Sequence, residues 1–171
     1  KILLKDGSLD KACKRGFPTP WNSLTYFLKL DKLFKGNRTF GGYHQTFLSE
    51  HETNAVDCIM GAYMLIPHEV INKVGLLDED FFMYGEDIDW CYRIREAGYE
   101  IIYYPKSVIT HYKKASFNKR RKQTIKEFYS SMKIFYKKHY EDKYPLVVKG
   151  VVYLGINLRY LIAVLMNSIK K

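Results

Sequence analysis

The sequence predicts an α/β fold. In the middle of the 171-residue chain, short runs of β-forming residues alternate with segments that have the apolar spacing of helices, and longer helical segments follow. Hydrophobic residues make up 47% of the chain and aromatic residues 16%, which excludes an intrinsically disordered protein. With 11 glycines and 5 prolines, the chain is neither collagen-like nor of low complexity.

The expected elements follow one another without an internal repeat. The first fifty residues show little periodicity, so we expect irregular covering structure there, with one short helix over residues 22–33 and a loop over residues 37–52. A buried strand is expected over residues 56–66, because that run is mostly apolar. A helix is expected over residues 68–74, since a proline stands at its first turn and a glycine directly after its end.

Two short strands and two helices are expected in the second half of the chain. The helix over residues 86–97 turns Ile88, Cys91 and Ile94 inward, and a glycine closes it. The strands are rich in β-forming residues, and a proline stops the first of them. The remaining expected elements are strands over residues 99–104 and 107–110 and a helix over residues 124–140.

The three cysteines, Cys13, Cys58 and Cys91, are odd in number and form no CxxC pair. A disulfide framework or a structural zinc site needs paired cysteines at short spacing. We therefore expect neither of these, and the cysteine pattern favours a reducing compartment.

The net charge of +10 is unevenly distributed along the chain. Residues 76–100 contain eight acidic residues and two arginines, whereas residues 111–143 contain eleven basic residues and three acidic ones. A basic stretch interleaved with aromatic residues is compatible with nucleic-acid binding, but no RNP aromatics, GXXG loop or zinc-finger spacing accompany it. A solvated helix face and a membrane-surface role remain as interpretations of the same stretch.

Residues 145–169 form a strongly apolar stretch of about the length of a bilayer span. Lys149, Asn157 and Arg159 interrupt it, and an arginine near the middle of a span costs about 2.5 to 3.5 kcal/mol on insertion scales. An interfacial helix on an anionic membrane surface therefore fits better than a simple span. A core helix or a dimer helix is the alternative.

The most informative stretch is the acidic string over residues 75–93. It places Glu86, Asp87 and Asp89 at the start of a helix, where the helix dipole stabilises a carboxylate. Capping explains one such acid, but three within four residues, directly after an aromatic cluster, exceed what capping needs. One of these three carboxylates could therefore act as a general base that takes a proton from a hydroxyl.

These residues resemble those of a known enzyme family. The segments Gly61-Ala62 and Met64-Leu65, together with the string Asp78-Glu79-x-Phe81-Phe82-Met83-Tyr84-x-Glu86-Asp87-x-Asp89-x-Cys91-x-Arg93, are similar to family 2 inverting glycosyltransferases. The resemblance is to the rhamnosyltransferase-like branch, which builds surface polysaccharides, and it extends over residues 3–140. Relatives usually carry an arginine where this chain has Pro67-His68.

The resemblance implies the carboxy-terminal part of a GT-A fold, followed by C-terminal helices. In the family, the amino-terminal half holds the nucleotide-binding strands and an Asp-x-Asp metal motif, and this sequence has no such motif in that context. We therefore expect residues 1–122 to be the acceptor-side half of a catalytic domain whose donor-binding half is absent. Residues 123–171 are expected to form a basic and apolar helical extension that associates with a membrane, and the fragment alone is expected to be inactive.

The resemblance also assigns roles to individual residues. Asp87 corresponds to the general base, and Glu86 beside it contacts the acceptor or holds the start of the helix. His111 corresponds to a histidine that completes the coordination of Mg²⁺ or Mn²⁺, most of whose ligands lie in the absent half. The expected substrate-binding residues are Asp57, Gly61, Ala62 and Tyr84.

The activity implied is sugar transfer with inversion, with rhamnose as one candidate sugar. The donor is a nucleotide-diphospho-sugar and the acceptor a glycan or lipid-linked glycan, used in cell-surface polysaccharide synthesis. The expected location is cytoplasmic, peripheral at the inner face of the cell membrane, with no nucleic-acid partner. The alternative is a non-catalytic basic module that binds an anionic membrane or nucleic acid.

Overall fold

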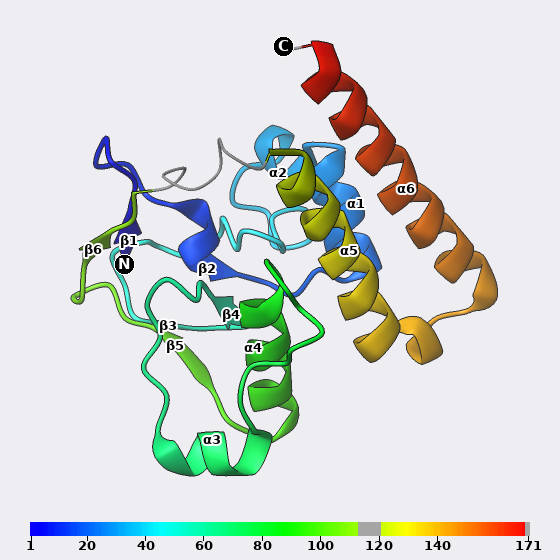
Figure 1. Ribbon diagram of the computed structural model, residues 1–171. Helices are drawn as coiled ribbons and strands as arrows, with labels where there is room; N and C mark the ends of the chain where they lie inside the picture. Colours follow the sequence, from blue (N-terminus) through cyan, green and yellow to red (C-terminus); the bar gives the residue numbers. More distant parts are fainter. Residues whose placement is uncertain (113–120, 170–171) are drawn as a thin grey trace. The chain divides into compact units, whose positions relative to one another are not determined.

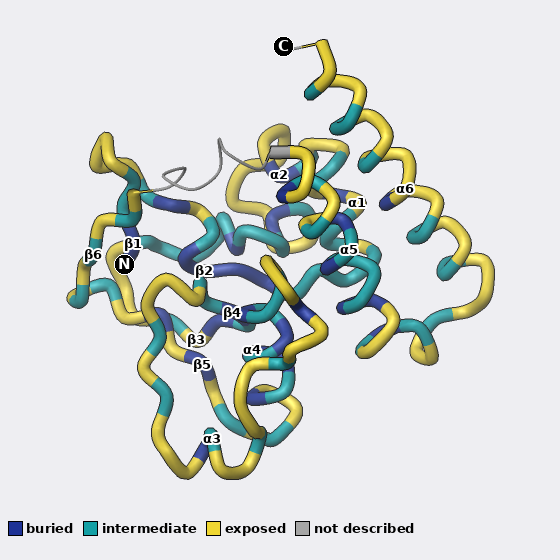
Figure 2. The backbone as a smooth tube through the Cα atoms, in the orientation of Figure 1, coloured by how far each residue is buried: buried dark blue, intermediate teal, exposed yellow. Residues whose placement is uncertain are grey.

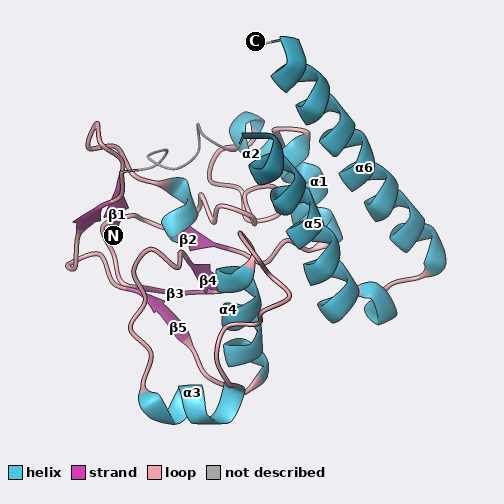
Figure 3. Ribbon diagram, viewed as in Figure 1, coloured by secondary structure: helices cyan, strands magenta, loops and turns pink. Residues whose placement is uncertain are grey.

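The computed structural model describes residues 1–112 and 121–169 (Figure 1). These residues fall into two compact units. The first unit comprises residues 1–77 and 87–112, and the second comprises residues 78–86 and 121–169. Short strands occur only in the first unit among the described residues, whereas the second is mainly helical (Figure 3).

Three two-stranded sheets form the framework of the first unit. One pair, β1 with β6, is parallel, and the pairs β2 with β4 and β3 with β5 are antiparallel. In the β2–β4 pair, Arg15 lies opposite Cys58, a register that brings the arginine next to the core. The strands are β1 (Ile2–Leu3), β2 (Lys14–Arg15), β3 (Asn54–Val56), β4 (Cys58–Ile59), β5 (Ile101–Tyr103) and β6 (Ile109–Thr110).

The helices of the first unit have local signals that explain where they begin and end. The Thr19 hydroxyl accepts a hydrogen bond from Asn22 N at 3.1 Å and caps the first helix, which begins with a proline. Gly75, with φ of 80°, ends the third helix in a conformation that favours glycine. The elements are a short 3-10 helix η1 (Lys11–Cys13), α1 (Pro20–Phe27), α2 (Leu30–Leu33), α3 (His68–Val74) and α4 (Glu86–Glu96). The first residue of α4, Glu86, belongs to the second unit.

The core of the first unit lies between the strands and one face of α4, where Figure 2 shows many residues coloured as buried. All three cysteines are buried free thiols in this core. Burying apolar side chains of this size contributes about 1.5 to 3 kcal/mol each, so the core is the main source of stability for this unit. Its buried members are Ile2, Cys13, Val56, Cys58, Val70, Cys91, Ile94, Ile101 and Tyr103.

The second unit is built on a helical hairpin. Helix α5 (Arg121–His139) is followed by the 3-10 helix η3 (Glu141–Lys143) and then by α6 (Leu146–Ile169), which packs against α5. Edge-on aromatic contacts join the two helices, with ring centroids 5.6 Å apart for Tyr136 and Tyr153.

The outer surface of α6 is apolar. Within the described residues, α6 is the helix long and apolar enough to cross a membrane. In its most apolar 18-residue stretch, only 6% of the residues are buried. The exposed apolar residues are Leu146, Val147, Val151, Leu154, Leu158, Leu161, Ile162, Leu165, Met166 and Ile169.

Most of the expected elements are present, and two expectations are wrong. The helices expected over residues 68–74, 86–97 and 124–140 are confirmed to within a few residues, and residues 37–52 contain neither helix nor strand. The strands near residues 99–104 and 107–110 are present but shorter.

The strand expected over residues 56–66 is wrong beyond Ile59, where the chain leaves β4 and turns. The Gly61 N–H donates to a carboxylate of α4 instead of to a neighbouring strand, which explains why this apolar run does not continue as a strand. The helix expected over residues 22–33 is divided into α1 and α2. Lys29, with φ of 58°, breaks it in a left-handed conformation.

Candidate active site

The carboxylate of Asp87 is fixed at the start of α4 by three N–H donors. Its Oδ2 accepts from Arg15 Nη2 at 2.7 Å and from Gly61 N at 3.1 Å, and its Oδ1 accepts from Ile88 N at 2.8 Å. Asp87 is only 9% exposed. A carboxylate bound in this way has one orientation, which is a requirement for a positioned base.

Arg15 reaches Asp87 from strand β2. The side chain of Arg15 is 10% exposed and that of Asp87, counted without its backbone, is 13% exposed. Solvent therefore screens their ion pair only weakly. Burial acts to lower the pKa of Arg15, but the charge of Asp87 and its hydrogen bond to the guanidinium help to hold that pKa above its ordinary value. Arg15 is therefore a permanent counter-charge beneath the start of α4.

Gly61 approaches the same carboxylate through its backbone. A Cβ atom built on Gly61 would lie 3.3 Å from Asp87 Cβ, a distance tighter than most real Cβ contacts. Gly61 and the following Ala62 are both exposed, so the turn beside Asp87 is open to solvent. Because residue 61 has no side chain, its backbone can approach Asp87 closely enough for the hydrogen bond, and the space beside the carboxylate stays open.

Asp57 lies at the bend between β3 and β4 and is half-buried. Burial raises the pKa of Asp57, and the charge of Arg95 and a backbone hydrogen bond from Phe17 oppose that rise. Gln45 Nε2 donates to Asp57 Oδ2 at 3.3 Å. This carboxylate belongs to the first unit, as Asp87 does, but it is held by different partners.

The residues immediately before α4 have a strained backbone. Tyr84 and Gly85 have φ values of 68° and 88°, and a non-glycine residue in this region costs about 1 to 2 kcal/mol. The Tyr84 side chain is 36% exposed, and its ring meets Phe128 of α5 edge-on. Glu86, half-buried, is the first residue of α4. Strain of this kind is typical of functional sites.

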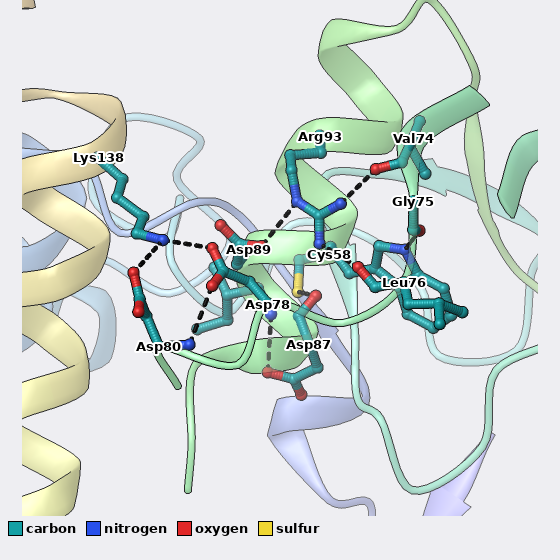
Figure 4. Close-up of polar contacts among 12 residues, drawn as sticks. Cys58, Val74, Gly75, Leu76, Asp78, Asp80, Asp87, Asp89, Arg93 and Lys138 are labelled. Carbon is teal, nitrogen blue, oxygen red and sulfur yellow. Dashed lines mark hydrogen bonds and ion pairs between the residues drawn. The ribbon is translucent and has the colours of Figure 1, made fainter. Parts of the chain in front are cut away.

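A second set of polar contacts fixes α4 to the end of α3 (Figure 4). Asp89 is fully buried, and its Oδ2 accepts from Arg93 Nε at 2.8 Å. The Arg93 guanidinium also donates to the carbonyl oxygens of Val74, at 2.5 Å, and Leu76, at 2.8 Å. Asp89 and Arg93 are therefore structural.

In the second unit, Lys138 of α5 binds two acidic residues of the segment over 78–86. Its ammonium group lies 2.5 Å from Asp78 Oδ2 and 2.6 Å from Asp80 Oδ2 (Figure 4). Asp78 Oδ1 accepts from Asp80 N at 3.0 Å, so Asp78 also bonds the backbone of its own loop. Part of the opposite charge separated along the sequence is thus paired within this unit.

His111 follows β6, where its backbone N–H donates to Leu3 O at 2.8 Å. Its Nδ1 is buried and has no hydrogen-bond partner among the described residues. Over residues 1–112 and 121–169 there is no group of three or more His, Cys, Asp or Glu side chains able to hold a metal ion. The histidine can supply one ligand, but the described residues do not form a complete metal site.

Comparison with known proteins places the sequence in a family. The model of the family described as "Glycosyltransferase like family 2" matches residues 30–130, more than half of the chain. The chain belongs to this family. The match includes Asp57, the turn at Gly61, Tyr84, the start of α4 and His111, whereas Arg15 lies outside it.

The relatives of this family 2 glycosyltransferase chain include rhamnosyltransferases, as the sequence resemblance implies. Over 93 residues it is 30% identical to the N-acetylglucosaminyl-diphospho-decaprenol L-rhamnosyltransferase of Mycobacterium tuberculosis, covering 54% of this chain and 30% of that protein. Over 64 residues it is 36% identical to rhamnosyltransferase WbbL of Escherichia coli, covering 37% of this chain and 24% of that protein.

A third relative is the low-salt glycan biosynthesis hexosyltransferase Agl10 of Haloferax volcanii, which is 42% identical over 52 residues, 30% of this chain and 17% of that protein. The chain spans less than a third of the length of these curated relatives. No solved structure matches it.

Sequence reasoning did not find Arg15. One arginine in a short strand carries no distinguishing pattern, and its role depends on the β2–β4 pairing, which places residues 43 positions apart side by side. The expected residues Asp87 and Gly61 are in direct contact, and Glu86 and Tyr84 precede Asp87 within one strained turn.

Proposed function

We propose that this family 2 glycosyltransferase chain carries the acceptor side of an inverting sugar transferase in which Asp87 is the general base. The observation that carries the proposal is the Asp87 carboxylate, fixed by Arg15 and Gly61 at the start of α4 beside an open turn. The donor is a nucleotide-diphospho-sugar, and rhamnose is the sugar that two of the relatives' names favour. Glu86 and Asp57, with Ala62 and Tyr84, are proposed to contact the acceptor.

The proposed reaction is a single displacement at the anomeric carbon. The acceptor hydroxyl donates a hydrogen bond to Asp87, and its oxygen attacks the face opposite the nucleotide. As the new C–O bond forms, the proton passes to the Asp87 carboxylate. The bond from the anomeric carbon to the diphosphate breaks, the nucleoside diphosphate leaves with the electron pair, and the configuration inverts. Arg15 and the Gly61 N–H keep the carboxylate in the orientation that this proton transfer requires.

We place residues 1–122 in the carboxy-terminal half of a GT-A domain, with the donor-binding half outside this chain and residues 123–171 as a helical extension. The family model matches residues 30–130, which include most of the first segment and little of the second. His111, with its buried Nδ1, is the proposed ligand of Mg²⁺ or Mn²⁺. When bound, such an ion offsets the negative charge that develops on the leaving diphosphate. The isolated chain is proposed to be inactive.

The second unit is proposed to rest on the inner face of the cell membrane. Helix α6 has an exposed apolar surface, and Lys122, Lys126 and Lys137 are exposed on α5. Apolar surface combined with basic residues is typical of interfacial helices on anionic lipid. This location suits a lipid-linked glycan acceptor and a role in surface polysaccharide synthesis, with no nucleic-acid partner.

The test is the Asp87→Asn variant of the full-length enzyme, assayed with a nucleotide-diphospho-sugar and a lipid-linked acceptor. We expect donor binding to persist and transfer to fall by about 10²- to 10⁴-fold, because the amide cannot accept the proton. Glu96→Gln, at the exposed far end of the same helix, is the matched control and should transfer at the parent rate. Near-parent turnover of Asp87→Asn would exclude this residue as the base.

A further inference from the structure

Two of the three buried cysteines lie side by side in the first unit. Cys58 on β4 and Cys91 on α4 are both fully buried free thiols. Their Sγ atoms lie 3.3 Å and 3.9 Å from the same atom, the carbonyl oxygen of Ile59. The two thiols also hydrogen-bond to each other. The sulfur atoms are therefore in contact where α4 packs against β4.

The contacts of the Asp87 carboxylate cross the same boundary. Cys58 lies opposite Arg15 in the β2–β4 pair, and its Sγ is 4.0 Å from the Asp87 carbonyl oxygen (Figure 4). Cys91 follows Asp87 by four residues, which places it about one turn further along α4 on the same face. A change in the distance between the two sulfurs therefore moves Asp87 relative to Arg15.

The two thiols of the pair differ in how readily they ionise. Burial raises the pKa of the Cys58 thiol, whereas the hydrogen bond from Cys58 lowers the pKa of Cys91. The thiolate is the nucleophilic form of a cysteine. Cys91 is therefore the better attacking group in an exchange with a disulfide.

Cys13 provides a contrast within the same core. It is also a free thiol and is only 2% exposed. Its partner, however, is the side chain of Tyr103 instead of a second thiol. The core thus contains one pair of thiols in contact and one cysteine that is similarly buried but lacks this arrangement, which makes Cys13 a matched control.

We propose that Cys58 and Cys91 form a reversible disulfide that switches off the candidate active site. The Cys91 thiolate attacks one sulfur of a small-molecule disulfide, whose other half leaves as a thiolate. The Cys58 thiolate then attacks the sulfur of Cys91 in this mixed disulfide, so that the bond between the two cysteines forms and the second small thiolate leaves. The two cysteine protons pass to the leaving thiolates, and the small disulfide is reduced by two electrons.

The position of the pair gives the reagent a route and the bond a consequence. The turn after β4 is exposed at Gly61 and Ala62, so the reagent reaches the sulfurs when this turn opens locally. Bonded sulfur atoms lie closer than hydrogen-bonded ones, so the disulfide draws β4 and α4 together and displaces Asp87 from its donors. This effect on transfer rests on the proposed function, whereas formation of the disulfide does not. Transient, redox-sensing disulfides are the kind usually found in reducing compartments.

The test oxidises the folded 171-residue chain with bis(2-hydroxyethyl) disulfide, blocks the remaining thiols with N-ethylmaleimide in denaturant, and maps the disulfides by mass spectrometry. We expect the bond between Cys58 and Cys91 to exceed each other pairing by about tenfold or more, because these two sulfurs are already in contact. The same oxidation in denaturing urea is the control. There the three pairings should form in comparable amounts, since the cost of loop closure rises only slowly with loop length. A folded chain that gives the mixture of the unfolded chain, or that forms no bond between Cys58 and Cys91, would overturn the inference.

Sugar transfer by the full-length enzyme tests the switch itself. We expect oxidation to slow transfer by about tenfold or more and dithiothreitol to restore it, because a displacement of about 1 Å in an active site costs about 10²-fold. Cys58→Ala and Cys91→Ala, which break the pair from either side, should resist this loss, whereas Cys13→Ala should remain sensitive. Oxidised enzyme that contains the disulfide and transfers at the parent rate would contradict the switch. Disulfide mapping involves no sugar transfer, so its result is independent of the base assignment.

Discussion

Removal of the Arg15 guanidinium tests whether Asp87 is held as the structure describes. Arg15→Met keeps an unbranched side chain in the core but leaves the buried Asp87 carboxylate without its counter-charge. Breaking one partner of a buried ion pair costs about 3 to 5 kcal/mol. Asp87 retains two backbone N–H donors, from Gly61 and Ile88. We therefore expect the free energy of unfolding to fall by about 3 kcal/mol, the lower end of this range.

The double-mutant cycle with Asp87→Asn isolates the pair from these other contacts. Asp87→Asn alone leaves the Arg15 charge buried and should cost about 3 kcal/mol, whereas the double variant contains no buried unpaired charge. We therefore expect the double variant to be about 2 to 3 kcal/mol more stable than the sum of the single effects predicts.

Urea unfolding followed by tryptophan fluorescence measures these free energies. Both tryptophans of the chain, Trp21 and Trp90, lie in the first unit with the ion pair, so their emission reports on the correct unit. Lys35→Met, at an exposed position of the same unit, is the control and should change stability by no more than about 0.5 kcal/mol. Additive single effects, within about 0.5 kcal/mol, would refute the buried pair.

Three further predictions concern the same unit. Gly61→Ala places a Cβ atom 3.3 Å from Asp87 Cβ, so we expect about tenfold slower transfer by the full-length enzyme but near-parent thermal stability; parent-rate transfer would contradict this. Burial lowers the pKa of His44 from 6.5 to about 4, although the charge of Asp31 acts to raise it. Between these two pH values His44 is therefore protonated in the unfolded chain but neutral in the folded chain. Stability should therefore fall by about 2 kcal/mol between pH 6.5 and pH 4, after allowance for solvent screening, and His44→Gln should flatten this part of the pH profile measured by urea unfolding. Arg93→Met removes the partner of a fully buried carboxylate and two carbonyl contacts, so we expect a loss of about 3 kcal/mol in chemical denaturation, and a loss below 1 kcal/mol would contradict that role.

The parts of the fold that were predictable have local causes. Helix α3 follows from Pro67 before it and Gly75 after it, and α4 follows from the apolar spacing of Cys91 and Ile94. The pairing of Asp89 with Arg93 was also predictable, because residues four apart share a helix face. Each of these signals lies within one or two helical turns of the residues it determines.

The parts that were missed depend on long-range contacts. The run after Ile59 is apolar enough for a strand, but its Gly61 N–H binds a carboxylate 26 residues later in the sequence. The break at Lys29 requires a left-handed conformation that lysine rarely adopts, and no glycine or asparagine at this position indicates it. The partner of Asp87 is set by strand pairing of β2 with β4, which a single sequence does not reveal.

The candidate site shows the same division. The string around Glu86 and Asp87 was sufficient to indicate the family, which the match over residues 30–130 confirms. The arginine beneath Asp87 appears only when segments distant in sequence come together.

The most direct test of the central claim, that Asp87 is the base of sugar transfer, is the single-turnover rate of the full-length enzyme with Asp87→Asn, measured beside Glu96→Gln. The account predicts that donor binding is unchanged in both variants, that Glu96→Gln transfers at the parent rate, and that Asp87→Asn is slower by about 10²- to 10⁴-fold. A single-turnover rate for Asp87→Asn within threefold of the parent would contradict it.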